Sequence, residues 1–328
     1  ASFSAYAFFK MNDLLEEADY PYYTMLKRRL IEEGMYGADF LMRMRAPSGN
    51  FFVTKSRTMD AYGPVASMRV LGAYHRNPTG RKGGGSWGNI DEITEYDYET
   101  SFRAGGGYAI AALAYAARVT YPSDYTKEEY LQTAVRAYDY LYANNELYAN
   151  DGKWNLVDEY CALDAVIEIY KTTKEIDYLR RARALAKRII DRYIPIDDTM
   201  GYLSVNGTDR PFFHAADAGM PVVNLLNYCA VERQAEDKAA VLAVCEKLMR
   251  HELSVTNEVA NPFGYARQFV QHGDGTKENQ FFYPHDVETA PWWQGENARI
   301  ASLAAAARSL TYYTKDAELA AALRKYAD

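Results

Sequence analysis

The segment SFRAGGGYAIAALAYAAR, residues 101–118, joins a polar head to a long run of small apolar residues. Apolar residues recur along it at three- and four-residue spacing, which is typical of a helix. The three consecutive glycines, Gly105, Gly106 and Gly107, would let neighbouring helices approach closely. The segment therefore predicts an interior helix in a helical protein.

Three other segments repeat this design, and they alternate with helices that are visibly amphipathic. The interior type recurs at LVDEYCALDAVIEIY, FFHAADAGMPVVNLLNYCA and GENARIASLAAAA, and the amphipathic type at EEYLQTAVRAYDYLYANN, EIDYLRRARALAKRIIDRY and EDKAAVLAVCEKLMRHEL. The heads Arg103, Glu159 and His214 lie roughly 55 residues apart, and a period of this size with two helices per unit indicates stacked helical hairpins. An inner ring of apolar helices inside an outer amphipathic ring is an (α/α) barrel.

The whole chain, residues 1–328, is expected to form one all-α domain of this kind. We expect helices at residues 3–17, 25–45, 102–120, 126–145, 156–173, 175–193, 211–232, 235–252, 296–311 and 315–328. Long irregular loops are expected near 46–100, with one short hairpin, and near 253–291. Both chain ends lie inside helical patterns, and about five hairpins are counted where a six-hairpin ring needs more chain. We therefore expect the barrel to be incomplete at both ends.

Composition narrows the function. The net charge of −7 argues against nucleic-acid binding, which requires clustered basic residues. No apolar run reaches transmembrane length, and no signal peptide is visible, so a membrane partner is not expected. The three cysteines have neither metal-ligand nor disulfide spacing, which weakly favours a reducing, cytoplasmic compartment. No phosphate-binding loop or dinucleotide motif is present, because RAGGGYA lacks a preceding strand. No cofactor and no metal is expected, and the oligomeric state stays open.

The aromatic content of 14%, with 29 tyrosines, favours carbohydrate binding, since flat amphipathic rings suit the apolar face and polar rim of a sugar. Candidate site residues lie at the heads of the predicted inner helices and in the loop FFYPHDVETAPWW. They are Arg103, Asp158, Glu159, Tyr160, His214, Asp217, His285, Asp286, Trp292, Trp293 and Glu296. Each also has a structural interpretation, as a helix cap, a core histidine, an ion pair or a lid over the core. Their convergence on one face favours a binding site.

Carboxylates with aromatics and no metal set indicate glycoside chemistry, in which most enzymes use one carboxyl group as acid and another as base or nucleophile. From the residues alone, Glu296 is the first acid to consider, because the adjacent Trp292 and Trp293 would reduce its hydration.

The chain resembles glycoside hydrolase family 9, in particular its exo-acting β-glucosidase and β-glucosaminidase-like members. The resemblance rests on five stretches in order, RRLIEEGMYGADFLMRMRAPSGNFF, FRAGGGYAIAALAYAAR, VDEYCALDAVIEIYKTT, PFFHAADAGMPVVNLLNY and WWQGENARIASLAAAARS. It implies an (α/α)6 barrel and hydrolysis with inversion at the anomeric carbon. The family's water-activating aspartates precede its first inner helix, and its acid follows a later LG-NP segment. The catalytic carboxylates are therefore expected upstream of Ala1 and downstream of Asp328, and Glu296 aligns with a sugar-contacting position.

Three functions follow as expectations. The first is an enzyme, an inverting O-glycosyl hydrolase acting from chain ends on β-1,4-linked glucosyl or glucosaminyl oligosaccharides. Its partner would be the oligosaccharide, stacked on Trp292 and Trp293 and bonded by the polar candidates. The second is a non-catalytic carbohydrate-binding toroid. The third is another (α/α)-barrel enzyme, such as a sugar epimerase or a polysaccharide lyase, in which Tyr160, His214 and His285 would be central.

Overall fold

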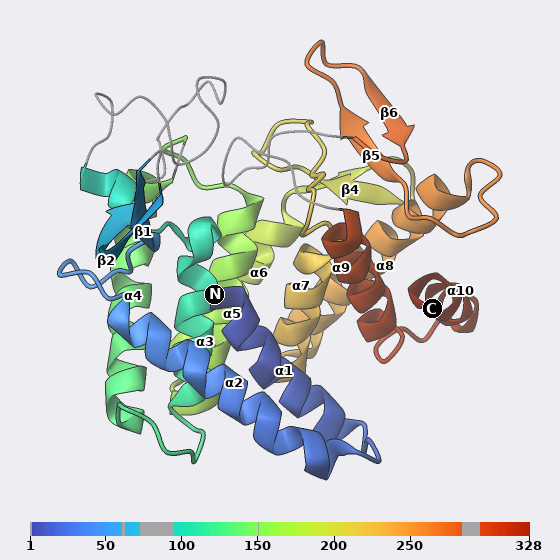
Figure 1. Ribbon diagram of the computed structural model, residues 1–328. Helices are drawn as coiled ribbons and strands as arrows, with labels where there is room; N and C mark the ends of the chain where they lie inside the picture. The colour runs from blue at the N-terminus through green and yellow to red at the C-terminus, as the bar shows by residue number, and fades with distance from the viewer. Residues whose placement is uncertain (1, 61–62, 73–94, 150, 284–295) are drawn as a thin grey trace. The chain divides into compact units, whose positions relative to one another are not determined.

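The computed structural model describes residues 2–60, 63–72, 95–149, 151–283 and 296–328. Within these ranges the chain is mainly helical, which confirms the predicted all-α class (Figure 1). The α-helices are α1 (Ser2–Glu17), α2 (Tyr23–Arg43), α3 (Gly107–Ala116), α4 (Lys127–Tyr148), α5 (Leu156–Thr173), α6 (Ile176–Ile190), α7 (Met220–Val231), α8 (Ala235–Asn257), α9 (Glu296–Leu310) and α10 (Ala317–Ala327). Each expected range overlaps one of these helices, although α1 and α2 begin earlier than expected and α4 and α8 end later.

Short strands form three separate antiparallel pairs, each of two strands. These are β1 (Thr54–Asp60) with β2 (Gly63–Gly72), β3 (Tyr193–Pro195) with β4 (Gly201–Leu203), and β5 (Gln268–Gln271) with β6 (Lys277–Gln280). The first pair is the hairpin expected between residues 46 and 100. The second and third pairs were not expected, and the third lies in the segment interpreted as irregular. Two short helices, η3 (Glu95–Tyr98) and η4 (Phe102–Gly106), precede α3.

The chain divides into two compact units. Unit 1 contains Ala1–Trp154 and Asp164–Tyr178, and unit 2 contains Asn155–Leu163 and Leu179–Asp328. The division runs through α5, whose first half belongs to unit 2 and whose second half belongs to unit 1. The expectation of a single domain over residues 1–328 stays a prediction.

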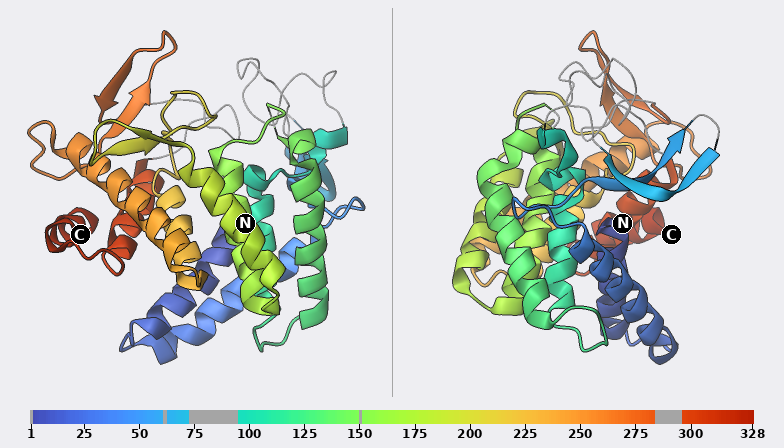
Figure 2. Two further views of the ribbon diagram at one scale, coloured as in Figure 1. Left: turned by 180° about the vertical axis from the view of Figure 1, so that it is seen from behind. Right: turned by 60° about the vertical axis from the view of Figure 1, so that its left-hand side comes forward.

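In unit 1, helix α3 has the interior character that its sequence predicts. Every residue from Gly107 to Ala116 is buried, and α3 packs against α1, α2 and the amphipathic α4. Phe9 of α1 stacks on Tyr115 of α3 with ring centroids 4.5 Å apart. Thr126 and Glu129 form a capping box that begins α4. An apolar helix surrounded by neighbours therefore forms the core of this unit (Figures 1 and 2).

A buried carboxylate ties three helices of unit 1 together. Glu168 of α5 accepts hydrogen bonds from the Tyr6 hydroxyl at 3.2 Å and from Lys171 at 3.1 Å, and it pairs with Arg118, which follows α3. Burial raises the pKa of Glu168. The positive charges of Lys171 and Arg118 have the larger combined effect and lower this pKa from 4.5 to about 2. The carboxylate is therefore held ionised inside the unit.

In unit 2, α7 packs against both α8 and α9, and α9 packs against α10. The β5 strand lies beside α8, as the views of Figure 2 show. The apolar α7 is paired with α8, and α9, which is rich in small residues, is paired with α10. This order follows the alternation of interior and amphipathic helices that the sequence predicts.

Helix α7 begins at Met220, so the expected start at residue 211 is wrong. The backbone N–H groups of Ala216 and Asp217 donate to Nδ1 of the His214 ring at 3.1 and 3.0 Å. These bonds hold a turn before the helix, since the donors would otherwise join a helical ladder. Pro221 then lies in the first helical turn, where its missing N–H has no cost.

The residue before α7, Gly219, lies very close to the backbone of α9. A Cβ atom placed on Gly219 would lie 2.0 Å from the carbonyl oxygen of Ser302. We therefore expect Gly219→Ala to lower the free energy of unfolding by about 1–3 kcal/mol, because backbone must move to admit the methyl group. Gly273→Ala is the matched control, since its Cβ would meet nothing within 4 Å. Urea unfolding of both variants checks this, and equal stabilities would contradict the close approach.

None of the described helices combines the length and the apolar character that crossing a membrane requires.

Candidate functional site

The candidate site residues fall into three groups in the structure. Asp158, Glu159, Tyr160, His214, Asp217 and Glu296 belong to unit 2, whereas Arg103 belongs to unit 1. His285, Asp286, Trp292 and Trp293 lie outside the described residues. Most of the candidates that the structure describes therefore belong to unit 2.

The two acidic residues in the first turn of α5, Asp158 and Glu159, both bind other groups of the protein. The Asn155 side chain accepts from the backbone N–H of Asp158, and Asp158 in turn accepts from the backbone N–H of Asn155 at 3.1 Å. This reciprocal arrangement is a capping box, which satisfies donors at the helix start. The buried Glu159 carboxylate accepts from Arg192 through two nitrogens, at 2.5 and 2.8 Å, and from Arg188. Both of its oxygens are thus occupied by guanidinium groups.

Tyr160, His214 and Asp217 form a connected cluster at the N-terminal ends of α5 and α7. The Tyr160 hydroxyl donates to Oδ2 of Asp217 at 2.9 Å. Because the His214 Nδ1 atom accepts two backbone N–H bonds, the neutral ring carries its proton on Nε2. Tyr160 and His214 are buried, whereas Asp217 is partly exposed. The cluster therefore holds Asp217 at two points, its carboxylate by the Tyr160 hydroxyl and its backbone N–H by the His214 ring.

Glu296 begins α9 and is held by the fully buried Arg299, one turn further along. The Arg299 guanidinium donates to Oε2 of Glu296 at 3.0 Å from Nε and 2.6 Å from the terminal nitrogen. The same guanidinium donates to the backbone carbonyls of Ala266 at 2.6 Å and Arg267 at 3.4 Å. The Tyr265 hydroxyl donates to the same Oε2 atom at 3.3 Å. Arg299 thus joins the start of α9 to residues 265–267, the segment that leads into β5.

Asp217 and Glu296 share one property that matters for binding. Each carboxylate has one oxygen fixed by the protein, and its other oxygen has no hydrogen-bond partner among the described residues. The Glu296 side chain is 15% exposed. Such oxygens are acceptors for hydroxyl or ammonium groups of a ligand.

The two carboxylates lie near the starts of the helices α7 and α9. Gly219, two residues after Asp217, donates its backbone N–H to the Ser302 hydroxyl at 3.0 Å. Ser302 is six residues after Glu296, or about 9 Å along a helix at 1.5 Å per residue. The start of α7 therefore lies less than two turns of helix from the start of α9, and these two helices pack against each other in unit 2 (Figure 1).

Arg103 lies in η4 of unit 1, where its role is visible in local contacts. Its buried guanidinium pairs with Asp151 and donates to the carbonyl of Lys153 at 3.0 Å. The Ser101 hydroxyl accepts from the N–H of Ala104 and begins the turn that positions Arg103. The guanidinium thus fixes the chain that leads into α5.

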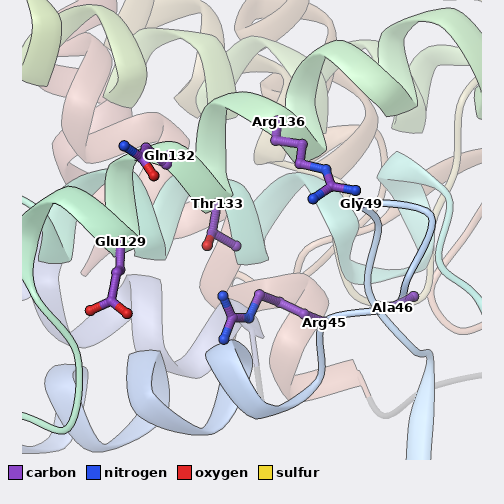
Figure 3. A pocket seen from close by; sticks show the side chains of 7 residues that line it. All are labelled: Arg45, Ala46, Gly49, Glu129, Gln132, Thr133 and Arg136. Atoms are coloured by element: carbon purple, nitrogen blue, oxygen red, sulfur yellow. The ribbon is translucent and has the colours of Figure 1, made fainter.

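A cavity of about 190 Å³ on unit 1 contains none of the candidate residues. Arg45, Glu129 and Arg136 contribute its charged groups, with Gly49 at its rim. In Figure 3 the Arg45 side chain points toward Thr133 and Glu129, whereas Arg136 points toward the Gly49 loop. Arg136 also donates to the carbonyl of Pro47 at 3.2 Å. Since the two guanidinium groups do not converge on one point, this cavity makes a poor anion site.

Among the described residues, no group of three or more histidine, cysteine or acidic side chains is arranged to hold a metal ion. The expectation of a site without metal stays a prediction.

Sequence reasoning missed several residues that build the site. Arg299 and Tyr265 hold Glu296, while Arg188 and Arg192 hold Glu159. The Glu296–Arg299 pair has the i,i+3 spacing of helical ion pairs, so this partner was visible in the sequence. The other three partners come from distant segments, and no local pattern indicates them.

Comparisons with known proteins connect this fold to carbohydrate-active enzymes. A cellobiose 2-epimerase from Bacillus thermoamylovorans B4167 matches with a TM-score of 0.55 and 9% identity, over 99% of this chain and 74% of the epimerase. A metagenome-derived glycoside hydrolase family 9 endoglucanase matches with a TM-score of 0.50 and 13% identity, over 98% of this chain. The chain spans about half the length of this endoglucanase, 51%. No protein-family model and no curated protein matches the sequence.

These likenesses show the fold, which is of the (α/α)6-barrel type, as the hairpin repeat predicts. The described chain contributes five of the helical pairs that build such a barrel, α1–α2 to α9–α10. The hydrolase and the epimerase share this architecture, so the fold by itself assigns no reaction to this chain.

Proposed function

We propose that this chain forms the body of a carbohydrate-active enzyme, a family 9-like inverting glycoside hydrolase. Its substrates are β-1,4-linked glucosyl or glucosaminyl oligosaccharides, which it shortens from one end. The observation that carries the proposal is the pair Asp217 and Glu296, each with one oxygen fixed and one oxygen available. Two such acceptors suit sugar hydroxyls, and they suit the protonated amine of an amino sugar even better.

In this proposal Glu296 binds substrate and is not the proton donor. Its Oε2 atom accepts from a buried guanidinium and from the Tyr265 hydroxyl, so the group is built as an acceptor. The catalytic acid and base are not assigned to any residue between Ala1 and Asp328. Trp292 and Trp293 remain proposed stacking residues, next to Glu296 in the sequence.

A sugar 2-epimerase is the second candidate, and His214 favours it. Epimerisation removes and returns a proton at the carbon beside the carbonyl, which requires an acid and a base within reach of that carbon. His214 lies in the cluster with Asp217, and its Nε2–H is a donor. It would therefore act as the acid, with His285 proposed as the base.

Binding and turnover separate these functions. We expect Asp217→Asn and Glu296→Gln each to weaken the binding of chitosan and cello-oligosaccharides about tenfold, because a charge-assisted hydrogen bond becomes a neutral one. Isothermal titration calorimetry measures this effect. Glu318→Gln, an exposed acid at the start of α10, is the control and should bind as the wild type does.

Product analysis on the natural full-length protein then decides the reaction. Release of single sugars supports the exo-acting hydrolase, whereas exchange of the C2 proton in heavy water without bond cleavage supports the epimerase. Binding without either reaction supports a non-catalytic carbohydrate-binding toroid. Failure to bind any of these oligosaccharides would sink all three.

A further inference from the structure

Unit 2 exposes an unusual group of aromatic side chains beside Glu296. Phe263 is 94% exposed, and Tyr265, Phe281 and Phe282 are exposed by 37, 40 and 45%. Folded proteins leave single apolar residues at the surface routinely, but contiguous aromatic patches mark binding surfaces. We call Phe263, Tyr265 and Phe281 the aromatic shelf.

Hydrogen bonds of the Asn261 side chain hold the backbone on both sides of Phe263. The Asn261 side chain donates to the carbonyls of Thr256 and Tyr265, at 3.2 and 2.8 Å, and accepts from the N–H of Tyr265 at 3.0 Å. The N–H of Gly264 donates to the carbonyl of Asn261, and Gly264 has a φ of +62°. Phe263 thus lies at the tip of a turn closed by three hydrogen bonds, and a fourth ties Asn261 to the carbonyl of Thr256. The backbone of this turn therefore loses little entropy when a ligand covers it.

Tyr265 and Phe281 are coupled to each other and to the Glu296 site. Their rings meet edge to face with centroids 6.2 Å apart, and the Arg267 guanidinium lies 5.1 Å from the centroid of Phe281. The Tyr265 hydroxyl donates to Glu296 at 3.3 Å, and Arg299 fixes the carbonyl of the intervening Ala266. Tyr265 therefore contacts the Glu296 carboxylate through its hydroxyl group, while its ring forms part of the aromatic shelf.

We propose that the aromatic shelf is a stacking subsite for a sugar unit of an oligosaccharide whose neighbouring unit is bound at Glu296. This inference rests on the proposed function. A pyranose ring has an apolar face that covers an aromatic ring and hydroxyls at its edge. The shelf supplies the rings, and the open oxygen of Glu296 supplies the acceptor next to them. The subsite makes affinity depend on chain length, since an oligomer that covers both Glu296 and the shelf makes contacts that a sugar held at Glu296 alone lacks.

The test compares sugars of increasing length, from disaccharide to hexasaccharide, in calorimetric titrations with cello- and chitosan oligomers. We expect Phe263→Ala and Phe281→Ala to weaken binding of the longest oligomers about tenfold, because burying about 50 Å² of ring surface is worth about this factor. Disaccharide affinity should stay at the wild-type value. Tyr312→Ala removes a 75% exposed ring elsewhere in unit 2 and is the matched control.

The outcomes separate this inference from the proposed function. Phe263 is almost fully exposed, so its replacement keeps the fold intact even where Phe281→Ala does not. Length-independent affinity in wild type and variants, with binding retained, overturns the shelf and leaves the proposed function standing. Absence of binding by the wild type overturns the proposed function itself. A dimer in sedimentation velocity that Phe263→Ala abolishes would make the shelf a protein interface and overturn the inference.

Discussion

Glu168→Gln is expected to destabilise unit 1 strongly, because Glu168 is fully buried and paired with two basic side chains. The variant leaves Arg118 and Lys171 next to a neutral amide, with their side chains only 28 and 23% exposed. Breaking a buried ion pair from one side costs about 3–5 kcal/mol, because the remaining charge loses its partner and stays desolvated. Urea unfolding at neutral pH measures the loss. Glu32→Gln, an exposed acid on α2, is the control and should change stability by less than about 0.5 kcal/mol.

The same carboxylate predicts a pH dependence whose sign is fixed. The pKa of Glu168 is lowered from 4.5 to about 2 in the folded protein. A carboxyl group whose pKa is lower in the folded state stabilises the fold at pH values above its unfolded-state pKa. The contribution of Glu168 to folding stability is therefore complete above pH 4.5 and is lost as the pH falls toward 2. The loss amounts to about 3 kcal/mol, at about 1.4 kcal/mol per pKa unit. The wild type should therefore lose this stability on acidification, and Glu168→Gln should lack that component.

Hydrogen exchange locates the effect. Glu168 joins α5 to Tyr6 of α1 and to Arg118 after α3, so faster exchange in Glu168→Gln should be concentrated in these three helices. Uniformly faster exchange, or none, would show that the network does not hold them together.

The helices could be predicted from the sequence because burial of one helix face imposes a regular spacing on the apolar residues. A helix with one buried face repeats its apolar residues every three or four positions, and α3 and α6 show the two extremes, fully apolar and strongly amphipathic. The start of α7 was misplaced since nothing local in residues 211–219 forbids a helix. The side chain of His214 decides the turn there, by accepting two backbone N–H groups.

The candidate site was predictable only in its outline. Polar heads on apolar helices indicated Tyr160, His214 and Asp217, and the structure joins these three through hydrogen bonds. The same pattern selected Glu159, whose carboxylate accepts from Arg188 and Arg192 at the end of α6. A polar residue at the start of an inner helix has the same local sequence pattern whether its side chain binds an outer helix or faces a ligand. Only the positions of partners distant in the chain distinguish them.

Arg299→Met is the second change with a large expected effect, and it tests the join between α9 and the aromatic shelf. Arg299 is fully buried, and methionine fills a similar volume without hydrogen-bond donors. The carboxylate of Glu296 and the carbonyls of Ala266 and Arg267 would lose their donor. We expect a loss of about 3–5 kcal/mol in unfolding free energy, as for other buried ion pairs broken from one side. Arg308→Met, exposed on the same helix, is the control.

The double variant Arg299→Met/Glu296→Gln decides how much of that loss belongs to the charge. Removing both partners of a buried pair costs less than removing one, because no uncompensated charge remains. We expect the double variant to recover part of the stability lost in Arg299→Met, and the carbonyl contacts to account for the remainder. A double variant less stable than either single one would mean that Glu296 stabilises unit 2 without its arginine. Oligosaccharide binding should be lost in Arg299→Met even at temperatures where it stays folded, since the guanidinium aims both Glu296 and the segment that holds Tyr265.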